Sequence, residues 1–266
     1  MDIPWLYDIP LWVVAILFAV VLFLALESGF RIGLRQRHAS KSSEKNTRGD
    51  VTLNSMLALL GLILAFTYAF TLSRADARKN AIVDEANVIG TAFFRADFLA
   101  DPGRSDLRAR LLDYARTRVI TYETTRDQKA REALIDHTLE AQSQIWPALE
   151  RALQGKTLGP YETSMIQAIN EVLDAQTRRI TVAFDRMPPI VSILLLAIAA
   201  ISLAVAGSNA GLAGRFNRWR MSGFVMILTA LMLVILDFDQ PQAGLIRLNN
   251  SPIIVLVEEM EKTSAN

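Results

Sequence analysis

The feature that most constrains the fold is an apolar segment that passes without a break into a charged helix. Residues 51–72 are almost entirely apolar and long enough to cross a bilayer core of about 30 Å. The charged stretch 73–97 that follows contains no Pro and a single Gly, so nothing in it stops the helix. A helix that leaves a membrane and continues into a polar domain can carry force between the two. This pattern favours a gated membrane protein over a soluble enzyme.

The composition fits a membrane protein with a substantial polar part. Of the 266 residues, 52% are hydrophobic and 21% are charged. Basic residues number 28 and acidic residues 27, so the net charge of +1 predicts no nucleic-acid partner. The chain has no cysteine, and its histidines are His38 and His137, so we expect no metal site and no cofactor. No nucleophile–base pair or phosphate loop is visible in the sequence, and we expect no enzymatic activity.

Four apolar segments predict an all-α membrane protein with four transmembrane helices, at residues 9–26, 51–72, 189–206 and 221–236. The last segment is short and would need tilt or local thinning of the bilayer. The expected organisation is an N-terminal transmembrane pair with a basic loop (1–72), an extramembrane helical domain (73–187), a C-terminal transmembrane pair (188–238), and a tail with a short amphipathic helix (239–266).

Charge asymmetry predicts the orientation. The loops 27–50 and 207–220 are rich in Arg and Lys, and the second contains no acid, so both are expected in the cytoplasm. The two termini and residues 73–187 would then lie outside. Residues 1–8 carry two acids and no base, which is unlike the start of a secretory signal, so we interpret the first apolar segment as a retained helix.

Residues 73–187 show apolar spacing typical of four helices in an antiparallel bundle with narrow seams. Pro147 is expected to kink the third helix, and Pro188 with Pro189 to end the fourth. Whether the bundle is self-contained or leans on neighbouring copies stays open. The amphipathic stretch 253–260 would either lie on the membrane or dock on the bundle. The predicted seam residues, in chain order, are Ile82, Ala86, Ile89, Phe93, Ala96; Leu107, Leu111, Tyr114, Tyr122; Ile135, Leu139, Trp146, Leu149, Leu153; and Met165, Ile169, Leu173, Ile180, Phe184.

Two rows at i, i+4 spacing run along the second spanning helix. One row is small and would let another helix approach closely, and the other is apolar and ends in an arginine. Around a symmetric axis the apolar row would form a hydrophobic constriction closed by a ring of Arg, which favours anions. The alternative is that the apolar row faces lipid and the arginine snorkels to the interface. The small row is Gly61, Ala65, Ala69 and Ser73, and the apolar row is Leu62, Phe66, Phe70 and Arg74.

Further charges follow on the same predicted helix. Arg78 and Lys79 would add to a charged vestibule if they face the axis. Asp84 and Glu85 are neighbours on a helix, where adjacent side chains diverge, so they are a poor cation site and we interpret them as a solvated or subunit-facing surface.

Two acids end the fourth spanning segment. Asp237 and Asp239 are interpreted as interfacial, with pairing to Arg247 or a place in an ion pathway as open alternatives.

Two longer motifs carry a family resemblance. The cassette LALLGLILAFTYAFTLSRADARKNAIVDEANVIGTAFFRADFL and the ending ILDFDQPQAGLIRLNNSP together resemble the bacterial bestrophin-like domain family of multi-pass membrane proteins. The resemblance extends from about residue 51 to residue 252. It implies a relation to bestrophins, which are oligomeric anion channels with four spanning helices per subunit. In bestrophins, apolar and Phe side chains at i, i+4 and i+8 on the second spanning helix line a narrow neck, and Leu62, Phe66 and Phe70 resemble that arrangement. No counterpart of an acidic calcium clasp is present, and the orientation predicted here differs from that of bestrophins, which keep their large domain in the cytoplasm.

The leading hypothesis is a homo-oligomeric ion channel of a bacterial inner membrane, in contact with lipid, with copies of itself and with inorganic ions. The second hypothesis is a non-conducting membrane scaffold or envelope stress sensor that acts through its helical domain. Oligomeric state separates the two, because a monomer or dimer could hardly surround a pore with one such helix from each subunit.

Overall fold

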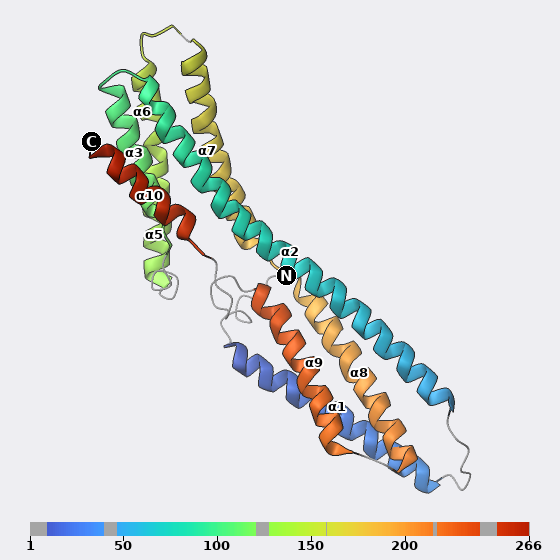
Figure 1. The fold of residues 1–266 in the computed structure, drawn as a ribbon. Coiled ribbons are helices and arrows are strands. Elements are labelled where there is room, and N and C mark those ends of the chain that lie inside the picture. Colours follow the sequence, from blue (N-terminus) through green and yellow to red (C-terminus); the bar gives the residue numbers. More distant parts are fainter. Residues whose placement is uncertain are drawn as a thin grey trace. The chain divides into compact units, whose positions relative to one another are not determined.

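The computed structural model describes residues 10–39, 47–120, 128–157, 159–214, 217–239 and 249–265, and within these ranges it contains helices and no strand. The all-α class is therefore confirmed (Figure 1). The elements are α1 (Leu11–Ala39), α2 (Thr47–Arg95), the 3-10 helix η2 (Ala96–Phe98), α3 (Gly103–Thr117), α5 (Gln128–Ser143), α6 (Ile145–Leu153), α7 (Pro160–Phe184), α8 (Pro189–Ala213), α9 (Arg218–Asp239) and α10 (Ser251–Ser264).

The chain divides into two compact units. Unit 1 comprises Met1–Ser73 and Arg186–Ile246, and unit 2 comprises Arg74–Asp185 and Arg247–Asn266. Four helices are long and apolar enough to cross a membrane, which confirms the predicted number of spanning segments. The fourth is α9, which has 22 residues and therefore extends over about 33 Å. The predicted segment 221–236 was too short, because the helix also takes in the charged or polar residues at both of its ends.

Unit 1 is held together by an apolar core to which all four spanning helices contribute. Phe18, Leu22 and Leu26 of α1 and Leu60 and Leu64 of α2 are buried in it. The contributions of α8 and α9 are Leu195, Ala199, Leu203, Val225, Leu228, Met232 and Ile235. Most other apolar side chains on these helices are exposed in the single chain, as expected for helices surrounded by lipid or by further protein.

Helix α1 extends well beyond its apolar part, and this corrects the expectation of a loop from residue 27 onward. It continues to Ala39 through the basic residues, and the part of that predicted loop at residues 40–46 lies outside the described residues. The helix is supported by an ion pair one turn apart, in which Arg31 Nε lies 2.9 Å from Glu27 Oε1. No Pro interrupts the stretch, so charge alone did not indicate the end of the helix.

Helices α1 and α8 of unit 1 are in close backbone contact at two glycines on each helix. A β-carbon added to Gly29 or Gly33 would overlap the carbonyl group of Ala204 or Ser208. The contact is reciprocal, since a β-carbon on Gly207 would overlap the backbone of Leu26. The residue numbers rise together along the two helices, so α1 and α8 run in parallel. Small residues four apart on both helices allow the two backbones to approach closely. Inside a membrane the hydrophobic effect does not drive helices together, so the van der Waals contacts of this close packing stabilise the pair.

Unit 2 is a helical bundle whose core combines residues from α2, α3, α5, α6, α7 and α10. The predicted seams of its first two helices are confirmed for the described residues, because Ile82, Ile89, Phe93, Leu107 and Tyr114 are among its buried side chains. Tyr122 lies outside the described residues.

The seams of the third and fourth predicted helices were partly wrong. Ile135 and Leu139 are each about half exposed, and α5 instead buries Thr138 and Ala141. These smaller side chains form the face that α5 turns inward, which moves the buried row away from the larger apolar residues. On α7, Met165 and Ile169 are buried, whereas Ile180 and Phe184 near its C-terminal end are exposed in the single chain.

The predicted kink at Pro147 is a complete break three residues earlier. Helix α5 ends at Ser143 and α6 begins at Ile145, which places Pro147 in the first turn of α6. Proline is tolerated there because it has no N–H group to donate, and its ring would clash with the carbonyl of residue 143 in a continuous helix.

Helix α10 docks on the bundle, which decides between the two alternatives for the amphipathic tail. Ile253, Leu256 and Met260 lie on one face of α10 and belong to the core of unit 2. Arg116 of α3 forms a salt bridge with Glu261 of α10 at 2.7 Å. Figure 1 shows α10 beside α3 in the same unit.

Candidate functional site

The predicted pore-lining row on α2 lies on a side of the helix that the described part of the chain leaves exposed. Leu62, Phe66 and Phe70 are 54%, 58% and 70% exposed. The opposite face packs inward through Leu60, Leu64, Thr67 and Thr71. Each threonine hydroxyl donates to the carbonyl oxygen four residues earlier, at 2.8 Å. These hydroxyl groups therefore have hydrogen-bond partners within the helix, and they lie on the face opposite the apolar row.

The small row beside it is also uncovered. Gly61, Ala65, Ala69 and Ser73 are exposed, and a β-carbon added to Gly61 would meet no atom within 4 Å. Within the described residues of this chain, no helix uses this row as a packing surface. The two rows therefore form one continuous face of α2 that the described residues leave uncovered.

The charged residues that follow on α2 have different surroundings in unit 2. Arg74 is partly exposed and lies 3.3 Å from Asp185 through its Nε atom. Arg78 is 2% exposed, and its guanidinium donates to the carbonyl oxygens of Val182 and Asp185, at 3.2 and 2.6 Å. A positive charge at this position satisfies the free carbonyls at the C-terminal end of α7. Arg78 thus closes a helix end and does not line an open vestibule.

Lys79 and Asp84 are exposed, as a vestibule would require, whereas Glu85 is not. The interpretation of Asp84 and Glu85 as a solvated or subunit-facing surface was wrong for Glu85, which is fully buried within the single chain. The divergence of adjacent side chains on a helix explains the difference, because it turns Asp84 outward and Glu85 into the bundle.

Glu85 is the centre of a buried charge cluster that joins α2, the C-terminal end of α3 and α7. One carboxylate oxygen lies 2.7 Å from Arg118 Nε and accepts a hydrogen bond from the Tyr114 hydroxyl at 3.1 Å. The other oxygen accepts from Arg179 Nη1. Two guanidinium groups therefore share a single buried carboxylate. Removal of one member from such a cluster leaves an uncompensated charge in a medium of low polarity.

The cluster also holds the segment that precedes α10. The side-chain oxygen of Asn250 accepts from Arg179 Nη2 at 3.4 Å, and its amide donates to the Ile120 carbonyl oxygen at 2.6 Å. Burial raises the pKa of Tyr114 far above its usual value, and the negative charge of Glu85 adds to this effect. Burial likewise lowers the pKa of Arg179, an effect that Glu85 opposes.

The acids at the end of α9 are buried in unit 1, and their predicted position at the membrane boundary stays a prediction. Asp237 and Asp239 are 5% and 3% exposed. Asp239 Oδ1 accepts a hydrogen bond from the backbone N–H of Met187, which precedes α8, at 2.9 Å. Phe238 between them meets the ring of Tyr68 edge-on at 6.0 Å. This end of α9 therefore fixes the start of α8. Arg247, the partner considered from the sequence, lies outside the described residues.

A model of the bestrophin-like domain matches residues 16–253 of the chain. The chain belongs to the bestrophin-like family. The match includes every member of the pore row and of the buried charge cluster.

The solved structures agree with this assignment at the level of the fold. The bestrophin-like chain is similar to the crystal structure of a bacterial bestrophin homolog from Klebsiella pneumoniae, in a mutated form, with a TM-score of 0.65. The similarity covers 93% of this chain and 98% of the homolog at 10% sequence identity. At that identity the likeness shows a common fold and nothing finer. No curated protein matches the chain.

Sequence reasoning missed most of the charge cluster of this bestrophin-like chain. Arg118 and Arg179 lie 33 and 94 residues from Glu85 along the chain, so no local pattern links them. A signal was nevertheless present, since Glu85 and Asn250 each lie in one of the two motifs that carry the family resemblance. The structure joins both residues through Arg179.

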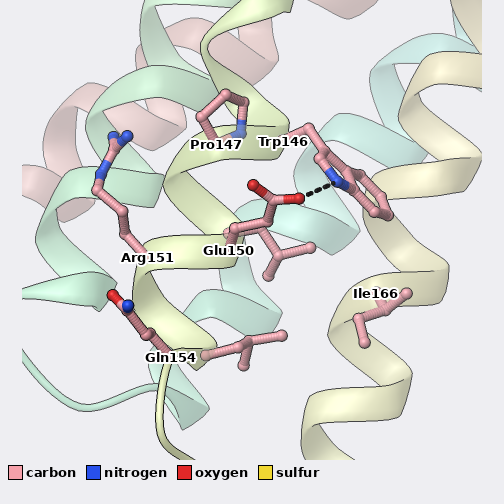
Figure 2. A pocket seen from close by; sticks show the side chains of 8 residues that line it. Trp146, Pro147, Glu150, Arg151, Gln154 and Ile166 are labelled. Atoms are coloured by element: carbon pink, nitrogen blue, oxygen red, sulfur yellow. Dashed lines mark hydrogen bonds between the residues drawn. The ribbon is translucent and has the colours of Figure 1, made fainter.

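A separate surface pocket of about 510 Å³ lies between α6 and α7. Figure 2 shows Trp146 and Glu150 on one side and Ile166 on the other. Three of its polar side chains have partners, because the Trp146 indole donates to Glu150 at 3.0 Å and Arg151 lies 2.8 Å from Asp106. The described residues hold no group of three or more His, Cys, Asp or Glu that could bind a metal ion. We assign no chemistry to this pocket.

Proposed function

We propose that this chain forms a homo-oligomeric ion channel of a bacterial inner membrane, with α2 lining the pore. The observation that carries the proposal is the uncovered face of α2, on which Leu62, Phe66 and Phe70 lie next to the small row. In a ring of subunits the small row would admit the α2 helix of a neighbour, while the apolar row would point to the axis. This is the arrangement that the bestrophin resemblance implies for the neck of the pore.

The apolar row would act as the gate. A constriction lined by Leu and Phe side chains excludes water when narrow and conducts when it widens. Helix α2 runs from this row into unit 2, so a rearrangement of the bundle would change the position of the Phe side chains. Unit 2 would then serve as a vestibule or gate-control domain.

Selectivity would depend on the exposed charges near the end of the row. Arg74 and Lys79 are candidates to attract anions, and Asp76 and Asp84 are exposed acids on the same helix. The charge of Arg74 is partly balanced by Asp185, so the anion preference would be modest. Arg78 and Glu85 are buried in this structure, and we do not include them among the groups that face permeating ions.

The positive-inside rule supports an orientation with unit 2 outside the cytoplasm. Because the chain has no cysteine, single substitutions test this directly. Lys156→Cys in unit 2 should react with an impermeant maleimide on intact spheroplasts, whereas Gln36→Cys near the end of α1 should react after permeabilisation only. Both positions are exposed in the structure. The reverse labelling pattern would contradict the orientation.

The channel proposal is tested by the current through the purified protein in a planar bilayer separated by asymmetric KCl, together with its oligomeric mass in detergent. We expect an oligomer of more than two subunits and discrete channel openings. The reversal potential of the current should be shifted from zero toward the equilibrium potential of chloride. A monomer or dimer that conducts nothing would overturn the proposal and favour the scaffold or stress-sensor alternative.

A further inference from the structure

One end of unit 1 gathers positive charge from two segments that are far apart in the sequence. The last turns of α1 carry exposed Arg31, Arg35 and Arg37, and the first turn of α9 carries exposed Arg218 and Arg220. We refer to these five arginines as the basic collar. Within residues 27–39 the acid is Glu27, which is paired with Arg31, and the sequence 207–220 contains no acid.

The packing of α1 against α8 places the two segments together. A β-carbon added to Gly214, the residue that ends α8, would overlap the guanidinium group of Arg37. The C-terminal ends of α1 and α8 therefore lie side by side. Helix α9 begins four residues after Gly214, and a chain of that length spans at most about 14 Å. The arginines at the start of α9 thus lie near those of α1, although no local sequence pattern connects them.

Trp219 indicates the depth of this end of the unit in a bilayer. It lies between Arg218 and Arg220 and is 87% exposed. An indole with arginines on both sides is poorly suited to the hydrocarbon core and is typical of the layer of lipid head groups. The exposed guanidinium groups of the collar are then at the level of the lipid phosphates.

We propose that the basic collar, together with Trp219, binds the phosphate groups of anionic phospholipids and so holds a shell of such lipids around this end of unit 1. Guanidinium groups form paired hydrogen bonds with phosphate oxygens, and basic residues next to a membrane attract anionic lipids. The collar supplies an excess of positive charge to match the negative head groups. The proposal holds whether or not the protein conducts ions.

The fluorescence of Trp219 provides a direct test in the full-length protein. Of the four tryptophans, the other three are replaced by the changes Trp5→Phe, Trp12→Phe and Trp146→Phe. The protein is reconstituted into mixed bilayers in which either phosphatidylglycerol or phosphatidylcholine carries bromine atoms that quench tryptophan. We expect phosphatidylglycerol to be enriched about fivefold or more over phosphatidylcholine at Trp219. One basic side chain near an anionic surface contributes a factor of about this size.

Charge-removing variants separate the collar from the general charge of the protein. Arg35→Gln/Arg37→Gln/Arg220→Gln should reduce the enrichment to about onefold, and Arg35→Gln/Arg220→Gln, which keeps the contact of Arg37 with Gly214, should reduce it in part. The matched control Lys156→Gln/Arg178→Gln/Lys262→Gln removes three exposed charges from unit 2 and should leave the enrichment unchanged. Equal quenching by the two lipids in the unsubstituted collar, or unchanged enrichment in both collar variants, would overturn the proposal.

Free phosphate ions could also supply the phosphate oxygens that the basic collar binds. The measurement is therefore repeated in sodium phosphate and in sodium chloride of equal ionic strength. A membrane lipid predicts the same enrichment in both salts, because screening is the same. If sodium phosphate alone abolishes the enrichment, the collar binds free phosphate and the assignment to lipid is wrong.

Discussion

Gly207 of α8 lies so close to Leu26 of α1 that a β-carbon on the glycine would overlap the Leu26 carbonyl oxygen. The same contact is repeated four residues further along both helices, where Gly211 lies against Phe30. Two spanning helices from opposite ends of the chain are therefore joined backbone to backbone. This contact sets the position of α8, and Asp239 of α9 fixes the segment that leads into it.

Gly207→Ala should destabilise unit 1, because the new methyl group can be accommodated only if the two helix backbones separate. We expect a loss of about 1–3 kcal/mol, as for overpacked sites. The measurement is thermal unfolding of the purified protein in detergent, followed by size-exclusion chromatography. Gly223→Ala on α9 is the matched control, since a β-carbon there meets no atom within 4 Å. Equal melting temperatures for the two variants would contradict the close contact.

Glu85→Gln should destabilise unit 2 strongly. It removes the carboxylate shared by Arg118 and Arg179 and leaves two buried positive charges together. The expected loss is about 3–5 kcal/mol, as for other buried ion pairs that lose one partner. Asp84→Asn changes the exposed neighbour and should have little effect. The free energy of unfolding from circular dichroism separates the two outcomes, and a mild effect of Glu85→Gln would mean that the cluster is not desolvated in solution.

The buried hydroxyl of Tyr114 should make the folded chain less stable at high pH. Burial raises its pKa, so it stays protonated in the folded chain above pH 10, where a tyrosine in the unfolded chain loses its proton. The folded state then binds more protons than the unfolded state, and stability falls as the pH rises above about 10, by up to about 1.4 kcal/mol for each pH unit. Tyr114→Phe should show a shallower decline between pH 10 and 11.5, measured as melting temperature. An identical slope in both proteins would count against a buried, protonated Tyr114.

Asp239 should matter through its hydrogen bond to the backbone of Met187. Asp239→Ala leaves that N–H group buried without this acceptor, at a cost of about 1–3 kcal/mol. Asp239→Asn keeps a side-chain oxygen and should cost less. Comparison of the melting temperatures of the two variants checks the ranking, and an equal loss for Asp239→Asn and Asp239→Ala would show that the site requires the negative charge and not merely an acceptor oxygen.

The spanning helices could be predicted because burial in lipid depends on long apolar composition, which the sequence displays directly. The helical continuation of α1 through Arg31 and Arg35 was not predicted, because the Gly29 backbone gains its contact from Ala204 of α8, which lies far away in the sequence. The exposed row of Leu62, Phe66 and Phe70 was readable from helical spacing. The inward direction of Glu85 was not, since it depends on arginines from two distant helices.

The seams of α5 illustrate a second limit. Periodicity favoured the large residues Ile135 and Leu139, but the folded chain buries Thr138 and Ala141. Hydrophobic spacing gives the existence of a helix more reliably than its rotation about its own axis, because a shift of one or two residues turns another face to the core.

If the exposed apolar row of α2 lines a pore, its side chains control the current through the protein. Single-channel currents of the unmodified protein are compared with those of Phe66→Ala/Phe70→Ala and of the control Leu17→Ala/Leu24→Ala, which removes two comparably exposed apolar side chains from α1. We expect the α2 variant to have a wider, hydrated constriction, so that its open probability or conductance rises, while the α1 control behaves like the unmodified protein. Unchanged currents in the α2 variant, from protein shown to be folded and oligomeric, would contradict this expectation.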